Sequence, residues 1–122
     1  MVQYQARLDS AFNAVGDPTR RGVLERLGRK RQSITELADA FGMTLTGMKK
    51  HVSILEDAGL VRTKKVGRVR TCELGKRRLA EEVAWMNKYQ QMLDERLDSL
   101  EDFLERTKEN DDDSNSHKKN QR

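Results

Sequence analysis

The 122-residue chain is poor in residues that constrain a fold covalently or by shape: it has one cysteine, one proline and 5% aromatic residues. The single cysteine, Cys72, excludes an intrachain disulfide and favours a reducing compartment. No apolar run is long enough to span a bilayer. The first residues, MVQYQARLDSAF, also lack the apolar core of a signal peptide. We therefore expect a soluble, cytoplasmic protein that makes no contact with a membrane.

Charged residues make up 36% of the chain and hydrophobic residues 35%, which allows one domain with a small core. Such a core is marginally stable alone, so burial of a further apolar face against a partner is expected. The net charge of +4 is unevenly spread. Residues 62–78 hold eight bases and one acid, whereas residues 79–109 hold nine acids and four bases. This segregation indicates a module that binds a polyanion, joined to a segment with another role.

Two amphipathic helices are predicted in the first thirty residues. The first has its apolar residues at helical spacing and ends at Gly16. Asp17 followed by Pro18 is a strong start for the second, because Asp caps free N–H groups and Pro lacks an N–H that would have no partner there. The second helix is expected over residues 19–27. The buried residues are expected to be Leu8, Ala11, Phe12 and Val15 in the first helix and Val23, Leu24 and Leu27 in the second.

The next stretch has the signature of a helix-turn-helix. Ser33 and Glu36 match a capping box, which predicts a third helix directly after Ser33. Gly42 is expected to end that helix in a left-handed turn, and Thr44 caps a fourth helix. The buried stripes are expected to contain Ile34, Leu37, Ala38 and Phe41 in the third helix and Met48, Val52, Ile54 and Leu55 in the fourth.

A β-hairpin is predicted after Gly59 ends the fourth helix. Residues 60–66 and 68–74 flank Gly67, and both runs alternate β-branched residues with basic ones. This alternation is typical of two strands with one face toward solvent. The expected turn is centred on Gly67, with its type left open.

A long helix is predicted after Gly75, because apolar residues follow alternating intervals of four and three over more than three heptads. Trp85, Tyr89 and Phe103 widen this stripe. Beyond about Thr107 the chain has no apolar residue, so residues 108–122 are expected to form a disordered polar tail. The predicted domain is therefore residues 1–107. The heptad positions are Leu79, Val83, Met86, Gln90, Leu93, Leu97, Leu100 and Leu104.

The fourth helix is the candidate reader of DNA bases, and the basic hairpin is the candidate clamp on the flanking backbone. Thr and Lys on an exposed helix face can bond base edges or phosphate oxygens, whereas hairpin cations mainly supply affinity and salt sensitivity. Surface lysines are commonly only solvated, and lysines on an edge strand also prevent aggregation. The order of turn, cap and hairpin favours the DNA-binding interpretation. The candidate residues are Thr44, Leu45, Thr46, Lys49, Lys50, His51 and Ser53 in the helix, and Lys64, Lys65, Arg68 and Arg70 in the hairpin.

Residues 16–74 resemble a winged-helix repressor of the arsenical-resistance-repressor (ArsR) family. The matching segments are GDPTRRGVLERL, ITELADAFGMT, KHVSILEDAGLV and a hairpin that ends in CEL. The resemblance implies a homodimeric, operator-binding transcriptional regulator, usually a repressor. By position it implies that residues 44–57 form the DNA-reading helix and residues 60–74 the wing.

The last helix resembles a subgroup of this family in which that segment dimerises. We therefore expect pairing through the first and last helices, with Gln90 as the residue that fixes the register of the helix pair. The reading helices would then meet successive major grooves about 34 Å apart. The candidate dimerisation residues are Leu8, Phe12, Leu79, Val83, Met86, Gln90, Leu93, Leu97, Leu100 and Leu104.

The metal-sensing members of the family carry a Cys pair in the third helix or Asp and His ligands on the last helix, and this chain departs from both patterns. Its third helix has neither Cys nor His, and its last helix has no His. The scattered Cys72, His51 and His117 are too few for a site with three or four converging ligands. We therefore expect no metal and no other cofactor.

Three side chains have competing interpretations. Cys72 could sense oxidants if nearby cations lowered its pKa, but a lone Cys in a strand is more often a small buried residue. His51 could contact phosphate or pack against the preceding helix, and the sequence favours neither. Trp85, with its neighbours, could line a small-ligand pocket, although such a stripe is usually core or interface.

The sequence therefore predicts a mainly α winged helix-turn-helix, with about five helices, a two-stranded wing and a long C-terminal dimerisation helix. We expect a sequence-specific, DNA-binding regulator that does not respond to metal. No pattern typical of an enzyme is present. Two alternatives are a ligand- or redox-gated repressor, and a helical interaction module in which residues 79–107 pair with a different protein.

Overall fold

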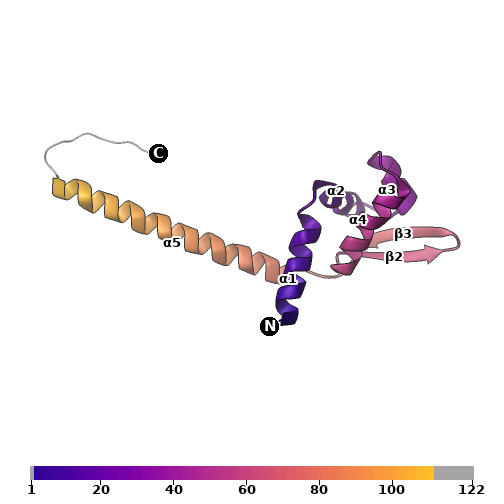
Figure 1. The fold of residues 1–122 in the computed structure, drawn as a ribbon, viewed down its shortest axis with the longest axis horizontal. Coiled ribbons are helices and arrows are strands. Elements are labelled where there is room, and N and C mark those ends of the chain that lie inside the picture. The colour runs from indigo at the N-terminus through magenta and orange to yellow at the C-terminus, as the bar shows by residue number, and fades with distance from the viewer. Residues whose placement is uncertain (1, 112–122) are drawn as a thin grey trace. The chain divides into compact units, whose positions relative to one another are not determined.

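The computed structural model describes residues 2–111 and contains five helices and three short strands within that range (Figure 1). By their internal contacts the residues form two compact units, Met1–Glu82 and Val83–Arg122. Within the described range, no helix is both long enough and apolar enough to cross a bilayer. The elements are α1 (Val2–Val15), α2 (Pro18–Leu27), β1 (Gln32–Ser33), α3 (Ile34–Ala40), α4 (Leu45–Asp57), β2 (Val61–Val66), β3 (Val69–Leu74) and α5 (Ala80–Asp111).

The predicted helix starts are confirmed by their capping bonds. The Asp17 carboxylate accepts a hydrogen bond from the backbone N–H of Arg20 at 3.0 Å, and Pro18 occupies the first turn of α2. Both bonds of the capping box between Ser33 and Glu36 are present at the start of α3. The hydroxyl of Thr44 accepts from the N–H of Gly47 at 3.0 Å and caps α4. The starts of these three helices thus follow from local sequence signals.

The wing has one more strand than the sequence predicted. The sheet is antiparallel in the order β1-β3-β2, so the expected two-stranded hairpin is extended by β1. β1 pairs Gln32 with Cys72 and Ser33 with Thr71. A strand of two residues has no detectable alternation, which explains why the pattern did not predict it. Val66 pairs with Val69 across a two-residue turn, where Gly67 has a φ of 63° that favours glycine.

The core lies between the helices and the sheet, and α4 contributes to its centre. Met48, Val52 and Leu55 on one side of α4 are at most 2% exposed. They pack with side chains from α2, α3 and the strands in one continuous cluster. The opposite side of α4 is free to face solvent. The cluster contains Ala14, Val23, Leu27, Ile34, Leu37, Ala38, Met48, Val52, Leu55, Ala58, Leu60, Val61 and Cys72.

The last helix, α5, begins at Ala80 and continues through Asp111, whereas the sequence predicted its end near Thr107. Residues 112–122 of the predicted polar tail lie outside the described residues. Leu79, the first heptad residue, precedes the helix and packs against the core of the first unit. From Val83 onward the side chains of α5 are exposed as far as residue 109.

The segment between β3 and α5 is pressed against the turn that follows α4. The backbone N–H of Gly75 donates to the carbonyl of Leu60 at 2.8 Å. A Cβ at Gly75 would lie 2.4 Å from the carbonyl oxygen of Gly59, which is backbone that cannot move aside easily. Glycine is therefore required at residue 75 by the close approach of two backbone segments.

We expect Gly75→Ala to lower the free energy of unfolding by about 1–3 kcal/mol, because the methyl group overpacks a backbone contact. Urea denaturation at a fixed protein concentration measures this change. Gly28→Ala is the matched control. Gly28 has a φ of −65°, and a Cβ added there would lie 3.3 Å from its nearest neighbour, the backbone carbonyl oxygen of Glu25. Its effect should stay within about 0.5 kcal/mol. Equal stability of the two variants would contradict the close-approach argument.

Candidate nucleic-acid interface

The exposed side of α4 gathers most of the candidate base-reading residues on one face. Thr46, Lys49, Lys50 and Ser53 are all exposed and recur at intervals of three and four residues. Leu45, at the first turn, is 43% exposed. The same helix buries Met48, Val52 and Leu55 on its other side. Packing of that buried side fixes which side chains α4 presents to solvent.

His51 lies between this exposed face and the core, and its ring is held by α2. The guanidinium of Arg20 contacts Nδ1 of His51 at 3.1 Å, and the Asp17 carboxylate lies 3.9 Å from the same nitrogen. Because a guanidinium only donates hydrogen bonds, Nδ1 is the acceptor, and the neutral ring carries its proton on Nε2. Of the two interpretations of His51, contact with an earlier helix is the one seen, but the helix in these contacts is α2 rather than the directly preceding α3. The structure does not test contact with phosphate.

Arg20 is a buried residue beside the candidate interface that the sequence analysis missed. It is 9% exposed, and besides His51 it donates to the carbonyls of Ala14 at 2.8 Å and Asn13 at 3.0 Å. These carbonyls belong to the last turn of α1, and that of Asn13 also accepts from the backbone N–H of Gly16 at 3.2 Å. A signal was present, because Arg20 lies three residues before Val23, on the apolar stripe of α2. A charged residue on a buried stripe indicates an internal bonding role.

The carboxylate of Asp17 is stabilised by the same network. Its pKa is lowered mainly by the hydrogen bond from the backbone N–H of Arg20, with a smaller contribution from the charge of the Arg20 guanidinium. Asp17 is therefore ionised near neutral pH, when it both caps α2 and faces His51.

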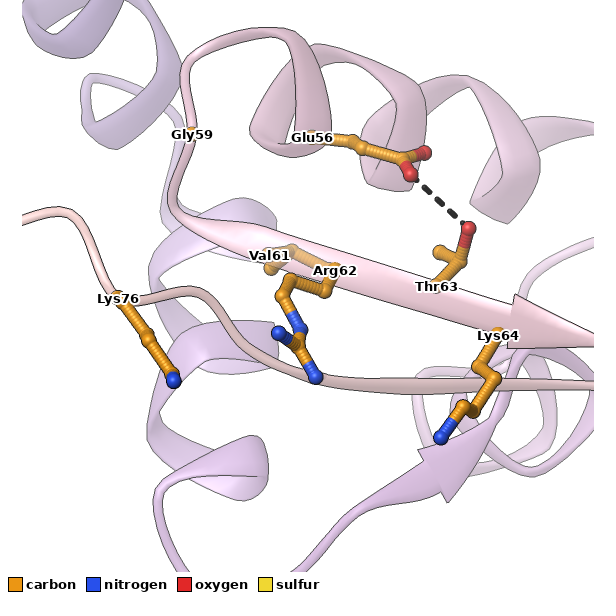
Figure 2. Close-up of a pocket in the computed structure, with 7 residues that line it drawn as sticks. All are labelled: Glu56, Gly59, Val61, Arg62, Thr63, Lys64 and Lys76. Carbon is orange, nitrogen blue, oxygen red and sulfur yellow. Dashed lines mark hydrogen bonds between the residues drawn. The ribbon is translucent and has the colours of Figure 1, made fainter.

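The wing has two faces that separate its cations. Residues directly opposite each other in an antiparallel pair share a face, and successive residues alternate. The inner face contains Val61, Thr63, Lys65, Arg70, Cys72 and Leu74, and the outer face contains Arg62, Lys64, Val66, Val69, Thr71 and Glu73. Thr63 donates from its hydroxyl to the Glu56 carboxylate of α4 at 3.0 Å, so the inner face is the one toward α4 (Figure 2). Lys65 and Arg70 therefore share a face with that contact, Lys64 lies on the other face, and Arg68 lies in the turn.

An ion pair occupies part of the outer face. Nε of Arg62 donates to the Glu73 carboxylate at 3.1 Å, and Arg31 lies 3.9 Å from its other oxygen. The hydrogen bond from Arg62 is the main reason that the pKa of Glu73 is lowered, and the charge of Arg31 adds to it. The acid of the wing thus lies between two arginines, and Lys64 is a further cation on this face.

Cys72 lies in β3 with none of its surface exposed. Burial raises the pKa of its thiol to about 11, the charge of Glu56 adds to this rise, and Arg70 opposes it only in part. The structure thus agrees with the interpretation of Cys72 as a small buried residue. Among residues 2–111, no three His, Cys, Asp or Glu side chains are grouped as metal ligands would be.

The candidate dimerisation residues fall into two groups. Leu8 is buried within its own chain, Phe12 is half-buried, and Leu79 packs on the core of the first unit. The others lie on α5, where the apolar ones are 38–56% exposed and Gln90 donates to Asp94 at 3.0 Å. The rings of Trp85 and Tyr89 stack along this helix with centroids 5.9 Å apart. The exposed group consists of Val83, Met86, Gln90, Leu93, Leu97, Leu100 and Leu104.

Comparison with known proteins gives consistent matches. A protein-family model described as a helix-turn-helix domain matches residues 15–64. YuzN of Bacillus subtilis, an uncharacterised HTH-type transcriptional regulator, is 38% identical over 69 residues, which cover 51% of this chain and 75% of that protein. SdpR of Bacillus subtilis, a transcriptional repressor, is 25% identical over 79 residues, covering 65% and 88% of the two chains. The crystal structure of an ArsR family transcriptional regulator is 44% identical with a TM-score of 0.67, covering 77% of this chain and 97% of that one.

These matches agree with the order of elements in the described residues. A capped helix-turn-helix is followed by a basic hairpin and a long last helix. The relative of 38% identity and the solved structure of 44% identity are both transcriptional regulators. The chain belongs to the ArsR family of winged-helix, DNA-binding transcriptional regulators.

Proposed function

We propose that the protein is a homodimeric repressor that binds a pseudo-palindromic operator. The observation that carries this proposal is the single exposed face of α4, where two lysines and two hydroxyl side chains stand above a buried apolar side. An α-helix of this kind fits the major groove, in which each base pair presents a distinct pattern of donors and acceptors. Thr46, Lys49, Lys50 and Ser53 would read base edges, with Thr44 and Leu45 at the entry of the helix.

The wing would supply affinity rather than sequence choice. Lys65, Arg70 and Arg68 lie on the inner face or at the tip of the wing, so they would neutralise phosphates next to the groove that α4 enters. The tip residue Arg68 is the candidate for the minor groove. His51, fixed through Nδ1 by Arg20, would offer Nε2–H to a phosphate oxygen.

Dimerisation would bury the exposed apolar stripe of α5. Six apolar heptad residues between 83 and 104 are exposed on one helix, and an unpaired stripe of this length is unfavourable in water. A second copy of the same helix offers a matching stripe, and a two-fold pair of reading helices would match a pseudo-palindrome. The alternative, pairing of residues 79–107 with a different protein, would use the same stripe.

Repression would follow from occupation of a promoter by the dimer. The relative SdpR is a transcriptional repressor, which supports repression rather than activation. We propose that release from DNA needs neither metal nor oxidant, because the third helix has no Cys or His and Cys72 is buried. Footprinting upstream of the protein's own gene tests the proposal. A protected pseudo-palindrome is expected, and the absence of any protected site would contradict operator binding there.

The variants Lys49→Ala and Arg68→Ala should distinguish base recognition by α4 from phosphate binding by the wing. Removal of the Lys49 side chain should reduce the preference for operator over random DNA by about 1–3 kcal/mol for each base that it reads. Removal of the Arg68 side chain should weaken binding to both DNAs and lower the salt slope of log K by about 2 per dimer. Mobility shifts at several salt concentrations measure both quantities. The reverse pattern would mean that the reader and the clamp have been exchanged.

Leu97→Asp should break the dimer, because it places a charge in the middle of the apolar stripe. We expect sedimentation to show single chains and operator affinity to fall at least tenfold. Gln91→Asp is the matched control, since it adds the same charge to α5 away from the heptad positions and should remain dimeric. A Leu97→Asp variant that stays dimeric would show that the stripe is not the interface. A wild-type dimer that does not bind the operator would contradict the DNA-binding proposal instead.

The thiol of Cys72 should react slowly in the folded protein. Because the pKa is raised from 9.0 to about 11, the folded protein has about 100-fold less thiolate at pH 8 than the unfolded chain. The thiolate becomes a large fraction of Cys72 only when the pH approaches 11. Alkylation rates at pH 8, measured by mass spectrometry with and without urea, should therefore differ by at least this factor. Peroxide should leave the operator complex intact. Release of wild type but not of Cys72→Ser by peroxide would support the redox-gated alternative.

A further inference from the structure

The sheet of the wing has one edge along β2 that no other strand of the described chain covers. The strand order is β1-β3-β2, so β2 has a neighbour on one side only. In an antiparallel ladder, hydrogen-bonded pairs alternate with non-bonded ones, and the pair that flanks a two-residue turn is bonded. The bond from the N–H of Gly75 to the carbonyl of Leu60 continues this series. Thr63 and Lys65 fall on the non-bonded positions, so their N–H and C=O groups point away from β3.

The backbone of Thr63 and Lys65 therefore offers a template for one further strand. Within residues 2–111, neither residue has a backbone hydrogen bond outside the ladder with β3. Together they present two donors and two acceptors, spaced roughly 7 Å apart along the strand. An extended chain that pairs with both residues can make four hydrogen bonds at once, which is how peptides add to exposed sheet edges.

An open groove runs along this edge. It has a volume of about 550 Å³, and it is lined by Arg62 and Lys64 from the outer face and by Val61 and Thr63 from the inner face. Because β3 occupies the other side of β2, residues of both faces can line one groove only along the free edge. The groove thus lies where an added strand would lie.

The two walls of the groove differ in charge. Figure 2 shows the basic side chains of Arg62, Lys64 and Lys76 on one side of β2, and Glu56 bonded to Thr63 on the other. Lys64 and Lys76 are exposed, and neither forms an ion pair with an acidic side chain of residues 2–111. An added strand would therefore meet cations with the side chains of one face and a carboxylate with those of the other.

This charge pattern disfavours a second copy of β2 as the occupant. A second copy would bring its own Arg62, Lys64 and Lys65 to the same edge, and like charges opposite each other destabilise a strand pair. Acidic side chains at every second position would instead face the basic wall. Neutral side chains between them would face the wall that contains Glu56, so charge complementarity selects an extended acidic segment.

We propose that the free edge of β2 binds an extended, acidic segment of a partner protein, which adds to the wing as a fourth strand. Backbone bonds to Thr63 and Lys65 would supply affinity. Acids at alternate positions, against Lys64 and Lys76, would supply selectivity for the partner. This surface needs no DNA, so its use goes beyond operator binding.

The probe for this site is an acetylated peptide in which threonine and glutamate alternate over seven residues. Amide hydrogen exchange of the isotope-labelled, full-length protein is followed by NMR. In the free protein the N–H groups of Thr63 and Lys65 should exchange faster than those of Arg62 and Lys64, which are bonded to β3. Saturating peptide should slow exchange at Thr63 and Lys65 at least tenfold.

Two N-methylated peptides of the same charge test for strand pairing. One carries the methyl groups on the threonine amides, and the other carries them on the glutamate amides. An added strand turns only alternate N–H groups toward β2, so one version should bind at least tenfold more weakly than the other. A peptide with glutamine in place of each glutamate should also bind more weakly than the acidic one.

Two double variants test the basic wall. Lys64→Gln/Lys76→Gln should lower the affinity for the acidic peptide at least fivefold. Lys88→Gln/Lys108→Gln removes the same charge from α5 and should keep wild-type affinity. All four side chains are exposed, so circular dichroism should show unchanged folding.

Three outcomes would overturn the proposal. Equal affinity of the two methylated peptides would mean attraction by charge alone, which a DNA backbone would also experience. Slow exchange at Thr63 and Lys65 that grows with protein concentration, without peptide, would mean that a second copy occupies the edge. Cations that only guard the edge against aggregation would leave the peptide unbound at millimolar concentration. Operator binding is measured separately with DNA, and none of these outcomes changes it.

Discussion

The buried guanidinium of Arg20 is the polar contact that ties α4, the proposed reading helix, to α1 and α2. It donates to two carbonyls at the end of α1 and to the ring of His51 on α4, and its own helix is capped by Asp17. One side chain thus joins three helices at the C-terminal end of α1, where carbonyls lack the helical N–H partners of the helix interior. Hydrogen bonds that involve a charged group stabilise by about 1.5–3 kcal/mol each, more than neutral ones. Burial of the apolar side of α4 fixes how closely this helix packs on the core. The hydrogen bond between Arg20 and His51 adds a directional contact at the middle of α4.

Strand alternation places a second constraint on the molecule. A hairpin with basic residues at successive positions cannot direct all of them to one partner, because neighbours point to opposite faces. Here the inner face is tied to α4 by the bond from Thr63 to Glu56, and the outer face carries the pair of Arg62 with Glu73. The cations of the wing therefore divide into a set on the face toward α4 and a set on the opposite face. This division follows from register alone and does not depend on side-chain flexibility.

Much of the fold could be predicted because its signals are local. Asp17, Ser33 and Thr44 cap the helices that the sequence assigned to them, and the family resemblance is confirmed by relatives that share its helix-turn-helix. What the sequence did not reveal is non-local. β1 is too short for a pattern and exists only because β3 pairs with it, and the contact of Arg20 with His51 spans 31 positions. The residues of the candidate interface were predicted individually, but their division between two faces of the wing needed the register of β2 and β3.

Basic and acidic residues are concentrated in different parts of the chain, the wing and α5. The bases of the wing are concentrated between residues 62 and 78, while residues 94–109 of α5 contain seven acids and three bases. A net charge of only +4 gives weak attraction to DNA over the whole molecule, so affinity has to come from the cations that touch phosphates. Acids on α5 make any approach of that helix to a phosphate backbone unfavourable within a Debye length of about 8 Å. Electrostatic repulsion therefore disfavours approach of DNA to α5, which agrees with the proposed contact through α4 and the wing.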